Sequence, residues 1–501
     1  MSSTSASSTS RPVGTDESPD PARWRALSLC LVAGFMTLLD VSIVNVALPS
    51  IRDGLRASDS GLQWIVAGYA LAFGMVLVPS GRIGDARSRR QVFAAGLALF
   101  TVASALCGAA QSTEWLVATR LLQGIGAGIL SPQVSGFIQT MFRGKERGRA
   151  FGMFGATVGI STAVGPLLGG LLVKFGGSDL GWRLVFYVNV PVGLAALALV
   201  PKLLPPTPTG RRQSLDPVGV LLFGAATVLV LLPLVSGSRT SLAARPWWLL
   251  AVSAALMVVF YLWERRWDAR RNATLVDLSL LRIRSYMLGL TLGTAYFAGF
   301  TSIFLVLTLY LQNGLGYDAL MAGITQMPFA LGSAVAAALG GRIVHHFGRA
   351  LVVAGLGLVL VGLVSVDLVV SHVHGDVGLK LALPLLLTGF GSGLTITPNV
   401  TLTLSEVDVR HAGSGGGMLQ TAQRVGSAIG VALVLAQFFS RLVSSHGDFA
   451  SAMSLGLRTT LAFVVVALLL GLADLFKSHR RAVEVRRVQP PEAVSDPPRR
   501  P

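Results

Sequence analysis

Residues 94–111 read AAGLALFTVASALCGAAQ, and the thiol of Cys107 is the only ionisable side chain in this stretch. Residues 218–235 read VGVLLFGAATVLVLLPLV and contain no ionisable side chain at all. A run of about 18 such residues is long enough to cross the roughly 30 Å hydrocarbon core of a bilayer as an α-helix. Because lipid offers no hydrogen-bond partner to the backbone, repeated runs of this kind predict an all-α bundle of membrane-spanning helices.

The composition of the whole chain agrees with this prediction. Its 501 residues are 52% hydrophobic and only 13% charged, whereas a soluble domain carries about 25% charged residues. The two cysteines, Cys30 and Cys107, both lie in apolar runs, which argues against a disulfide framework or a metal cluster. We therefore expect no metal site and no cofactor.

Apolar length and turn signals predict fourteen spans. The expected spans cover residues 26–48, 62–80, 92–110, 115–136, 148–173, 184–203, 217–236, 247–263, 286–311, 320–340, 350–370, 381–400, 413–439 and 455–476. The polar residues 1–22 and the basic, proline-rich residues 478–501 are expected to be disordered tails.

The distribution of basic residues predicts the orientation of the chain. With the N-terminus inside, 30 of the 41 lysines and arginines fall on the inner side and nine on the outer side, while Arg120 and Arg424 fall at membrane depth. Cytoplasmic loops of membrane proteins carry such an excess, so both termini are expected in the cytoplasm. The same asymmetry accounts for the net charge of +17 without a nucleic-acid partner.

A faint internal repeat divides the chain. The loop after the second span reads GRIGDARSRR over residues 81–90, and the loop after the tenth reads GRIVHHFGR over residues 341–349. Two like bundles facing each other across a midplane cavity are a known plan of transporters. We therefore expect a first six-span bundle over residues 23–204, a linker with two extra spans over 205–280, and a second six-span bundle over 281–477.

Two polar side chains stand out at membrane depth in the first bundle. Asp40 lies inside the apolar first span, in the sequence LDVSIVNVALP of residues 39–49. A buried acid is costly unless it is neutral or paired, so Asp40 either binds and releases protons or only forms hydrogen bonds between helices. Arg120 begins the sequence RLLQGIGAG of residues 120–128. It needs an acceptor, which Asp40 or a water chain could supply, and a purely structural role is the alternative.

Two further motifs concern helix contacts and loops. In the loop after the second span, Asp85 is surrounded by basic side chains and could exchange partners as a gate opens and closes, or the loop could simply follow the positive-inside rule. In the fifth span, small residues at 161, 165 and 169 form a ridge suited to close helix packing, and Pro166 adds a kink. The motif residues in these two segments are Gly81, Asp85, Arg89 and Arg90, and Gly152, Gly165, Pro166, Gly169 and Gly170.

In the order and location of these motifs the chain resembles the major facilitator superfamily, and within it the 14-span drug:proton antiporters. The resemblance covers nearly the whole chain apart from the tails. Ser42 stands where that family has threonine, and Ser88 where the loop signature has glycine. The resemblance implies two six-helix bundles plus two inserted spans, proton coupling at Asp40 and Arg120, a gating loop at Asp85, and an antiporter motif around Pro166. The segment from Trp182 also resembles the family, and Trp182 is interpreted as an anchor at the membrane interface.

Polar side chains in otherwise apolar spans are candidates for the substrate path. Each could equally be a structural residue, because the sequence does not fix which face of a span it occupies. The candidates are Asn45, Gln123, Gln326, Asn399 and Gln420.

The predicted function is proton-coupled export of small hydrophobic or cationic drugs or antibiotics across the cytoplasmic membrane by alternating access. The expected partners are a small-molecule substrate, protons as the coupling ion and the lipid bilayer. The first alternative is a transporter of the same fold with an endogenous metabolite as substrate. The second is a membrane-embedded enzyme or a sensor, for which the sequence offers no nucleophile–base set, metal cluster or nucleotide-binding loop. The substrate and the oligomeric state cannot be predicted from the sequence.

Overall fold

The computed structural model describes residues 21–206, 216–235, 246–270, 274–372 and 375–488. Within these ranges the chain forms fifteen α-helices, linked in places by short 3₁₀ or π turns. The first six are α1 (Ala22–Leu55), α2 (Asp59–Ala86), α3 (Arg89–Gly108), α4 (Thr113–Met141), α5 (Gly144–Tyr187) and α6 (Asn189–Leu203). The next two are α7 (Pro217–Val235) and α8 (Trp248–Ala269). The last seven are α9 (Arg284–Leu309), α10 (Ala319–Phe347), α11 (Arg349–His372), α12 (Val377–Lys380), α13 (Ala382–Thr403), α14 (Ala412–Ser444) and α15 (Phe449–Val488).

Fourteen of the helical segments are long and apolar enough to cross a membrane, which confirms the predicted number of spans. Helix α5 contains one span and the start of the next, because Gly177 bends the chain with φ 70° and ψ −169°. This left-handed backbone favours glycine. The two spans on either side of the bend are Gly144–Gly177 and Leu180–Leu203. None of the described residues lies in a β-strand.

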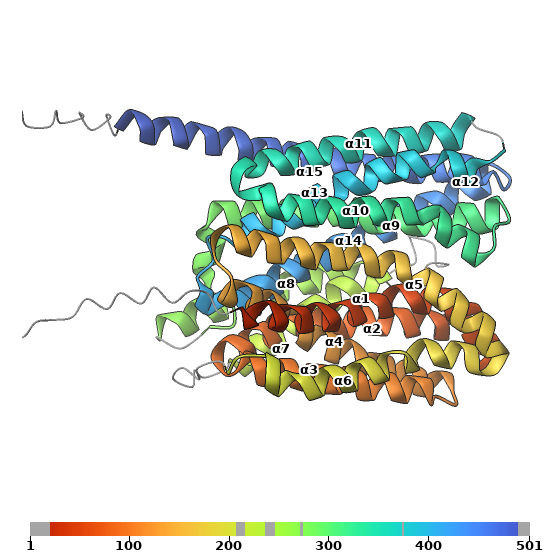
Figure 1. Cartoon of the computed structure of the whole chain (residues 1–501), viewed down its shortest axis with the longest axis horizontal. Helices are drawn as coiled ribbons and strands as arrows, with labels where there is room; N and C mark the ends of the chain where they lie inside the picture. Colours follow the sequence, from red (N-terminus) through yellow and green to blue (C-terminus); the bar gives the residue numbers. More distant parts are fainter. Residues whose placement is uncertain (1–20, 207–215, 236–245, 271–273, 373–374, 489–501) are drawn as a thin grey trace, which may run out of the picture.

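The long helices run side by side in two bundles (Figure 1). Of the inserted pair, α7 packs against α2 and α14, and α8 packs against α7. Helix α1 begins and α15 ends at the same end of the molecule, which we call the terminal end (Figure 1). The two bundles meet mainly along α2 with α14 and α5 with α10, with smaller contacts of α4 with α14 and α5 with α13. This arrangement confirms the predicted fold of two six-helix bundles plus two inserted spans.

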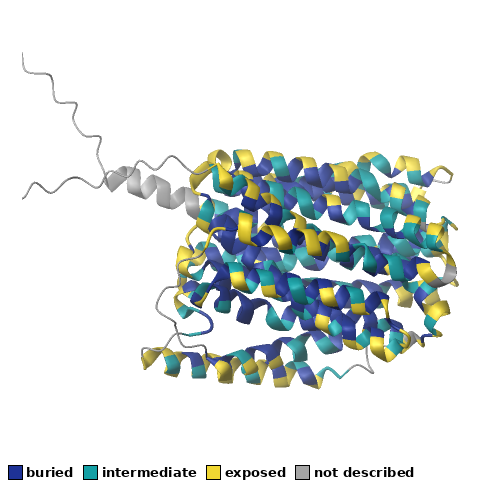
Figure 2. Ribbon diagram, turned by 60° about the horizontal axis from the view of Figure 1, so that its bottom comes forward, coloured by how far each residue is buried: buried dark blue, intermediate teal, exposed yellow. Residues whose placement is uncertain are grey.

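Burial separates a packed interior from an apolar outer surface. Side chains buried in each bundle form large apolar clusters, one centred on α1, α3 and α4 and another on α9, α11 and α15. Exposed positions lie on the outward faces of the helices and in the loops (Figure 2). Many of these exposed side chains are large and apolar, among them Leu221 at 73% and Leu383 at 73% exposure. An extended apolar exterior of this kind is suited to lipid rather than water.

The predicted role of Trp182 as an interfacial anchor is wrong. Trp182 is only 1% exposed and packs in an apolar cluster with Phe186, whose ring is 6.4 Å away in an edge-on arrangement. Its indole also lies against Gly54, where a Cβ atom would stand 2.7 Å from the indole nitrogen. The side chain therefore packs inside the first bundle, joining α5 to α1.

Candidate functional site

Asp40 and Arg120, the two charged side chains predicted at membrane depth in the first bundle, form a buried ion pair. Asp40 on α1 is 0% exposed and Arg120 on α4 is 2% exposed. The Arg120 Nη1 group donates to Asp40 Oδ2 at 2.5 Å. Breaking such a buried pair is costly, by about 3–5 kcal/mol, because the remaining charge is left uncompensated.

Three neutral side chains complete the environment of this pair. Gln123, one turn along α4, accepts from Arg120 at 2.7 Å and donates to Asp40 Oδ1 at 2.8 Å. It also donates to Ser104 of α3 at 2.6 Å. Asn189 at the start of α6 donates to Asp40 and to Ser104, each at 3.4 Å. One network around Asp40 thus joins four helices of the first bundle, with α4 and α6 bonded directly to the carboxylate on α1 and α3 bonded through Ser104.

The surroundings of Arg120 hold its guanidinium in place. Its Nε group donates to the backbone oxygen of Ile65 at 3.1 Å. Its guanidinium carbon lies 4.2 Å from the centroid of the Tyr69 ring and 5.8 Å from that of Phe186. In this arrangement both oxygens of Asp40 accept hydrogen bonds, Oδ2 from Arg120 and Oδ1 from Gln123 and Asn189.

At the terminal end, Asp85 joins the two bundles. Its Oδ1 and Oδ2 atoms accept from the backbone N–H groups of Gly413 and Ser414 at 2.9 and 2.8 Å. These groups belong to the first turn of α14, whose partial positive charge favours an anion. Arg89 donates to Asp85 Oδ1 at 2.6 Å and to the backbone oxygen of Val409 at 3.0 Å. Both side chains are almost fully buried, with 0% and 4% exposure.

The other residues of this loop have different roles. A Cβ atom at Gly81 would overlap the backbone oxygen of Gly413, so glycine allows α2 and α14 to meet closely here. Arg90 is partly buried and is not paired with Asp85. Ser88 has φ −124°, a backbone that needs no glycine, and its side chain accepts from the Gln91 N–H at the start of α3. The substitution of serine for glycine is therefore accommodated as a helix cap.

The small residues of α5 contact both bundles. A Cβ atom at Gly152 would lie 3.0 Å from the Ala337 oxygen and from the Gly341 Cα atom on α10. On the other side of α5, a Cβ atom at Gly165 would overlap the Ser42 hydroxyl of α1, which donates to the Ser161 oxygen at 3.2 Å. Pro166 lies against Gly323 of α10.

The last two glycines of the predicted motif differ from each other. A Cβ atom at Gly169 would lie 3.0 Å from Ile43 Cγ1, whereas nothing lies within 4 Å of one at Gly170. The close helix packing predicted for this segment therefore holds at Gly165 and Gly169, and Gly170 stands apart from it.

The five candidates for the substrate path lie in different places. Gln123 belongs to the Asp40 network described above, and Asn45 is exposed on α1. Gln326 is partly buried and donates to Thr308 of α9 at 3.2 Å. Gln420 on α14 accepts from Ser131 of α4 at 2.6 Å, so it bridges the two bundles. Asn399 is 2% exposed and its polar atoms are occupied within the second bundle.

Asn399 belongs to an ion-pair cluster that the sequence did not reveal. Arg349 donates to Asn399 Oδ1 at 2.7 Å and pairs with Asp474 at 2.6 Å. It also donates to the backbone oxygen of Ser285 at 3.0 Å. Arg349 is the last residue of the second copy of the repeated loop. This place in the repeat is the sequence feature that could have indicated that Arg349 forms an ion pair. The cluster ties α9, α11, α13 and α15 together at the terminal end.

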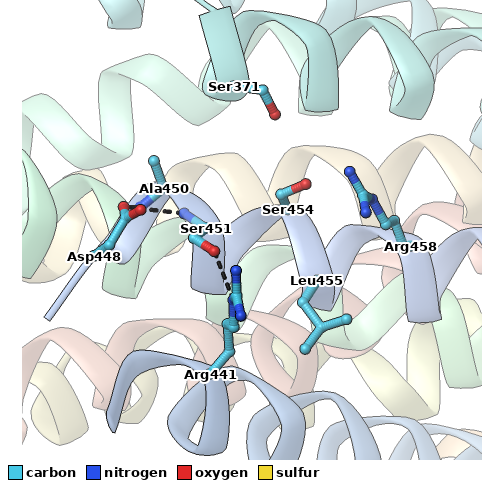
Figure 3. A pocket seen from close by; sticks show the side chains of 8 residues that line it. All are labelled: Ser371, Arg441, Asp448, Ala450, Ser451, Ser454, Leu455 and Arg458. Atoms are coloured by element: carbon cyan, nitrogen blue, oxygen red, sulfur yellow. Dashed lines mark hydrogen bonds between the residues drawn. The ribbon is translucent and has the colours of Figure 1, made fainter. Parts of the chain in front are cut away.

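A separate hollow of about 390 Å³ lies at the opposite end, between α11, the end of α14 and the start of α15. Figure 3 shows Arg441 directed to Ser451, to which it donates at 2.7 Å, and Asp448 accepting from the backbone at the start of α15. None of the predicted site residues lines this hollow. The lining consists of Ser371, Arg441, Asp448, Ala450, Ser451, Ser454, Leu455 and Arg458.

Comparisons with known proteins agree with the fold. A family model described as "Major Facilitator Superfamily" matches residues 30–431. The chain is 37% identical over 437 residues to a "Probable actinorhodin transporter" of Streptomyces coelicolor, covering 86% of this chain and 76% of the relative. It is also 37% identical over 429 residues to "Puromycin resistance protein pur8" of Streptomyces alboniger, covering 83% of this chain and 82% of the relative.

A solved structure has the same fold. The human organic anion transporter MFSD10 (TETRAN) matches with a TM-score of 0.65 over 90% of this chain and 100% of that chain, at 16% sequence identity. At this identity the likeness concerns the fold alone. The family model, by contrast, covers most of the sequence, including the buried pair and the contacts between the bundles. The chain therefore belongs to the major facilitator superfamily of membrane transporters.

Proposed function

We propose that the chain is a proton-coupled antiporter that exports small, largely apolar organic compounds, drugs and antibiotics among them. The observation that carries this proposal is the buried network of Asp40, Arg120 and Gln123, in which the carboxylate on α1 accepts hydrogen bonds from side chains of α4 and α6. A proton arriving at Asp40 weakens these contacts, and its departure restores them. Proton binding is thereby linked to the packing of the first bundle.

The direction of transport is proposed from two further observations. The relatives named above are a probable actinorhodin transporter and a puromycin resistance protein, and a transporter that confers resistance to a compound does so by moving that compound out of the cell. The excess of basic residues in the loops of the terminal end favours that end as the cytoplasmic one. In this orientation the Asp85 contacts close the cytoplasmic side, as one step of alternating access requires.

The proton gradient is sufficient for this task. A proton that moves inward down a potential of 100 mV releases about 2.3 kcal/mol, which corresponds to roughly a fiftyfold concentration ratio of the exported compound. Membership of a transporter family excludes the alternative of a membrane-embedded enzyme.

The experiment begins with expression in a drug-sensitive host and a panel of compounds, to find those to which tolerance increases. Everted membrane vesicles are then energised by respiration, and the pH gradient is followed with an acridine dye. We expect each compound identified in the first step to dissipate part of the gradient in vesicles that contain the protein. If tolerance increases but no compound changes the gradient, export by this chain is not proton antiport.

A further inference from the structure

Helix α2 carries two aromatic rings that lie between two arginines from different bundles. Tyr69 and Phe73 are one turn apart, with ring centroids separated by 6.1 Å and planes inclined by 27°. The guanidinium of Arg120 lies over Tyr69 at 4.2 Å from its centroid. The guanidinium of Arg424, on α14, lies over Phe73 at 4.5 Å from its centroid. We call these four residues the arginine–aromatic row.

The two arginines of the row differ in their counterions. Arg120 is paired with Asp40. No carboxylate among the described residues forms an ion pair with Arg424. Two other buried arginines do have a carboxylate partner, since Arg89 pairs with Asp85 and Arg349 pairs with Asp474. A ring face attracts a cation but does not neutralise it. The row therefore carries one uncompensated positive charge.

The neighbours of Arg424 on α14 provide polar groups at the meeting of the two bundles. Gln420, one turn before, contacts Ser131 of α4 in the first bundle. Ser427, one turn after, lies 2.8 Å from the hydroxyl of Thr301 on α9 in the second. Residues at this spacing share a helix face. Arg424 thus lies on the face of α14 that is directed toward helices of both bundles.

Aromatic rings continue this environment on α9. Phe297 is one turn before Thr301 and so lies on the same face of α9. Its ring is 5.4 Å from that of Phe300, which is 5.4 Å from that of Phe304. Phe297, Phe300 and Phe304 are each only partly buried. A cation and hydrogen-bonding groups therefore lie on α14 where it meets both bundles, and the neighbouring helix α9 carries aromatic rings on and beside the face that contacts α14.

We propose that Arg424 binds the acidic group of an aromatic organic anion, such as a carboxylate or a phenolate, during transport. This inference rests on the proposed export function and narrows its substrate class from apolar compounds in general to aromatic acids. A guanidinium offers planar paired donors to a carboxylate, and the rings of α2 and α9 offer stacking surfaces. A cationic compound, in contrast, would meet the charge of Arg424 and would find Asp40 already paired. An inside-negative membrane potential also favours the outward movement of an anion.

The test uses three compounds that differ in charge but share one ring system. They are naphthalene-2-carboxylate, naphthalene-2-carboxamide and naphthalen-2-ylmethylammonium, and their binding to the purified full-length protein is measured by calorimetry. The free energy of a hydrogen bond to a charged group corresponds to a change in affinity of about tenfold or more. We therefore expect the affinity of the wild type for the carboxylate to exceed its affinity for each of the other two compounds by about tenfold or more. In Arg424→Gln this preference is lost, while the affinity for the carboxamide changes by less than about threefold.

Matched variants show whether a lost preference for the carboxylate is caused by the missing charge of Arg424 or by misfolding. Lys380→Gln removes a positive charge from an exposed position on α12 and should keep the preference for the carboxylate. Phe73→Leu leaves the charge of Arg424 but removes the ring beneath it, and should weaken carboxylate binding while keeping some preference for it. If Arg424→Gln does not fold, Arg424→Lys takes its place and should bind the carboxylate more weakly than the wild type.

The outcomes separate this inference from the proposed function. A wild type that does not prefer the carboxylate, or that binds none of the three compounds, overturns the inference, as does an Arg424→Gln protein that keeps the preference. If a pH gradient drives export of the ammonium compound and Arg424→Gln leaves that transport unchanged, the export function stands and the inference fails. If the carboxylate binds through Arg424 but no gradient drives its transport, the binding site stands and proton-coupled export fails.

Discussion

The carboxylate of Asp40 and the guanidinium of Arg120 lie 2.5 Å apart, between α1 and α4, although 80 positions separate them in the sequence. Their contact is supplemented by Gln123, which bonds to both partners. Because both side chains are almost fully buried, water cannot replace either partner cheaply. The packing of α1 against α4 therefore depends on both side chains of this pair.

Arg120→Lys should abolish proton-driven export although it keeps the charge. An ammonium group is a point charge and cannot bond simultaneously to Asp40, Gln123 and the Ile65 oxygen with the geometry of the guanidinium. Transport is measured in everted vesicles at matched expression. Arg183→Lys is a suitable control, because the hydrogen bonds of Arg183 go to the backbone oxygens of Gly108 and Ala110 and its guanidinium otherwise lies over the ring of Trp182, with no carboxylate involved. Equal losses in both variants would contradict a specific role of Arg120.

Asp85→Asn should reduce the transport rate about tenfold, because a charge-assisted hydrogen bond contributes about 1.5–3 kcal/mol and the amide cannot accept from three donors as the carboxylate does. Expression and membrane insertion should be unchanged. Asp408→Asn is the matched control at the same end of the molecule. Its side chain is exposed, and the hydrogen bond from Arg410 lowers the pKa of Asp408 to about 2, so Asp408 stays ionised throughout the pH range of the assay. Unchanged transport in Asp85→Asn would refute the gating role.

Gly165→Ala should destabilise the protein, whereas Gly170→Ala should not. The new methyl group at 165 would overlap the Ser42 hydroxyl, while the one at 170 meets nothing within 4 Å. Overpacking of this kind costs about 1–3 kcal/mol of the free energy of unfolding. Thermal unfolding in detergent measures the difference. Equal melting temperatures for the two variants would mean that α1 and α5 are packed less closely than the structure indicates.

The terminal end should face the cytoplasm. Lys380→Cys, at the opposite end, should react with a membrane-impermeant maleimide in intact cells, and Arg410→Cys only after permeabilisation. Both positions are exposed, with 84% exposure for the Arg410 side chain. The native Cys30 and Cys107 are buried and should contribute little background. The reverse labelling pattern would invert the proposed topology.

The number of spans could be predicted, as could the need of Arg120 for a buried acceptor with Asp40 as one of two candidates, because each depends on a local property. A span is visible in its length and apolar composition, and a charged residue in such a span demands a partner. Helix rotation could not be predicted, because a span surrounded by lipid and protein is apolar on every face. Asn189 and Ser104 therefore went unassigned, although both bond near Asp40, Asn189 from 149 positions away.

The same limitation explains two other differences. Asn399 resembles a substrate-path residue in the sequence, yet its side chain is occupied by Arg349, whose own acid Asp474 lies on a different helix. Trp182 lies near the end of a span, where tryptophan often marks the membrane interface, but its side chain is buried and its indole lies against Gly54 of α1. In both cases the deciding contact comes from a distant part of the chain.

Asp40→Asn tests the central claim most directly. The purified protein is reconstituted into proteoliposomes with an imposed pH gradient, and uptake of a fluorescent substrate is followed. The neutral amide resembles the protonated acid in size and charge, so we expect substrate binding to remain measurable while gradient-driven transport falls to the level of empty liposomes. Full gradient-driven transport by Asp40→Asn would contradict the account, because the coupling proton would then be carried by another residue.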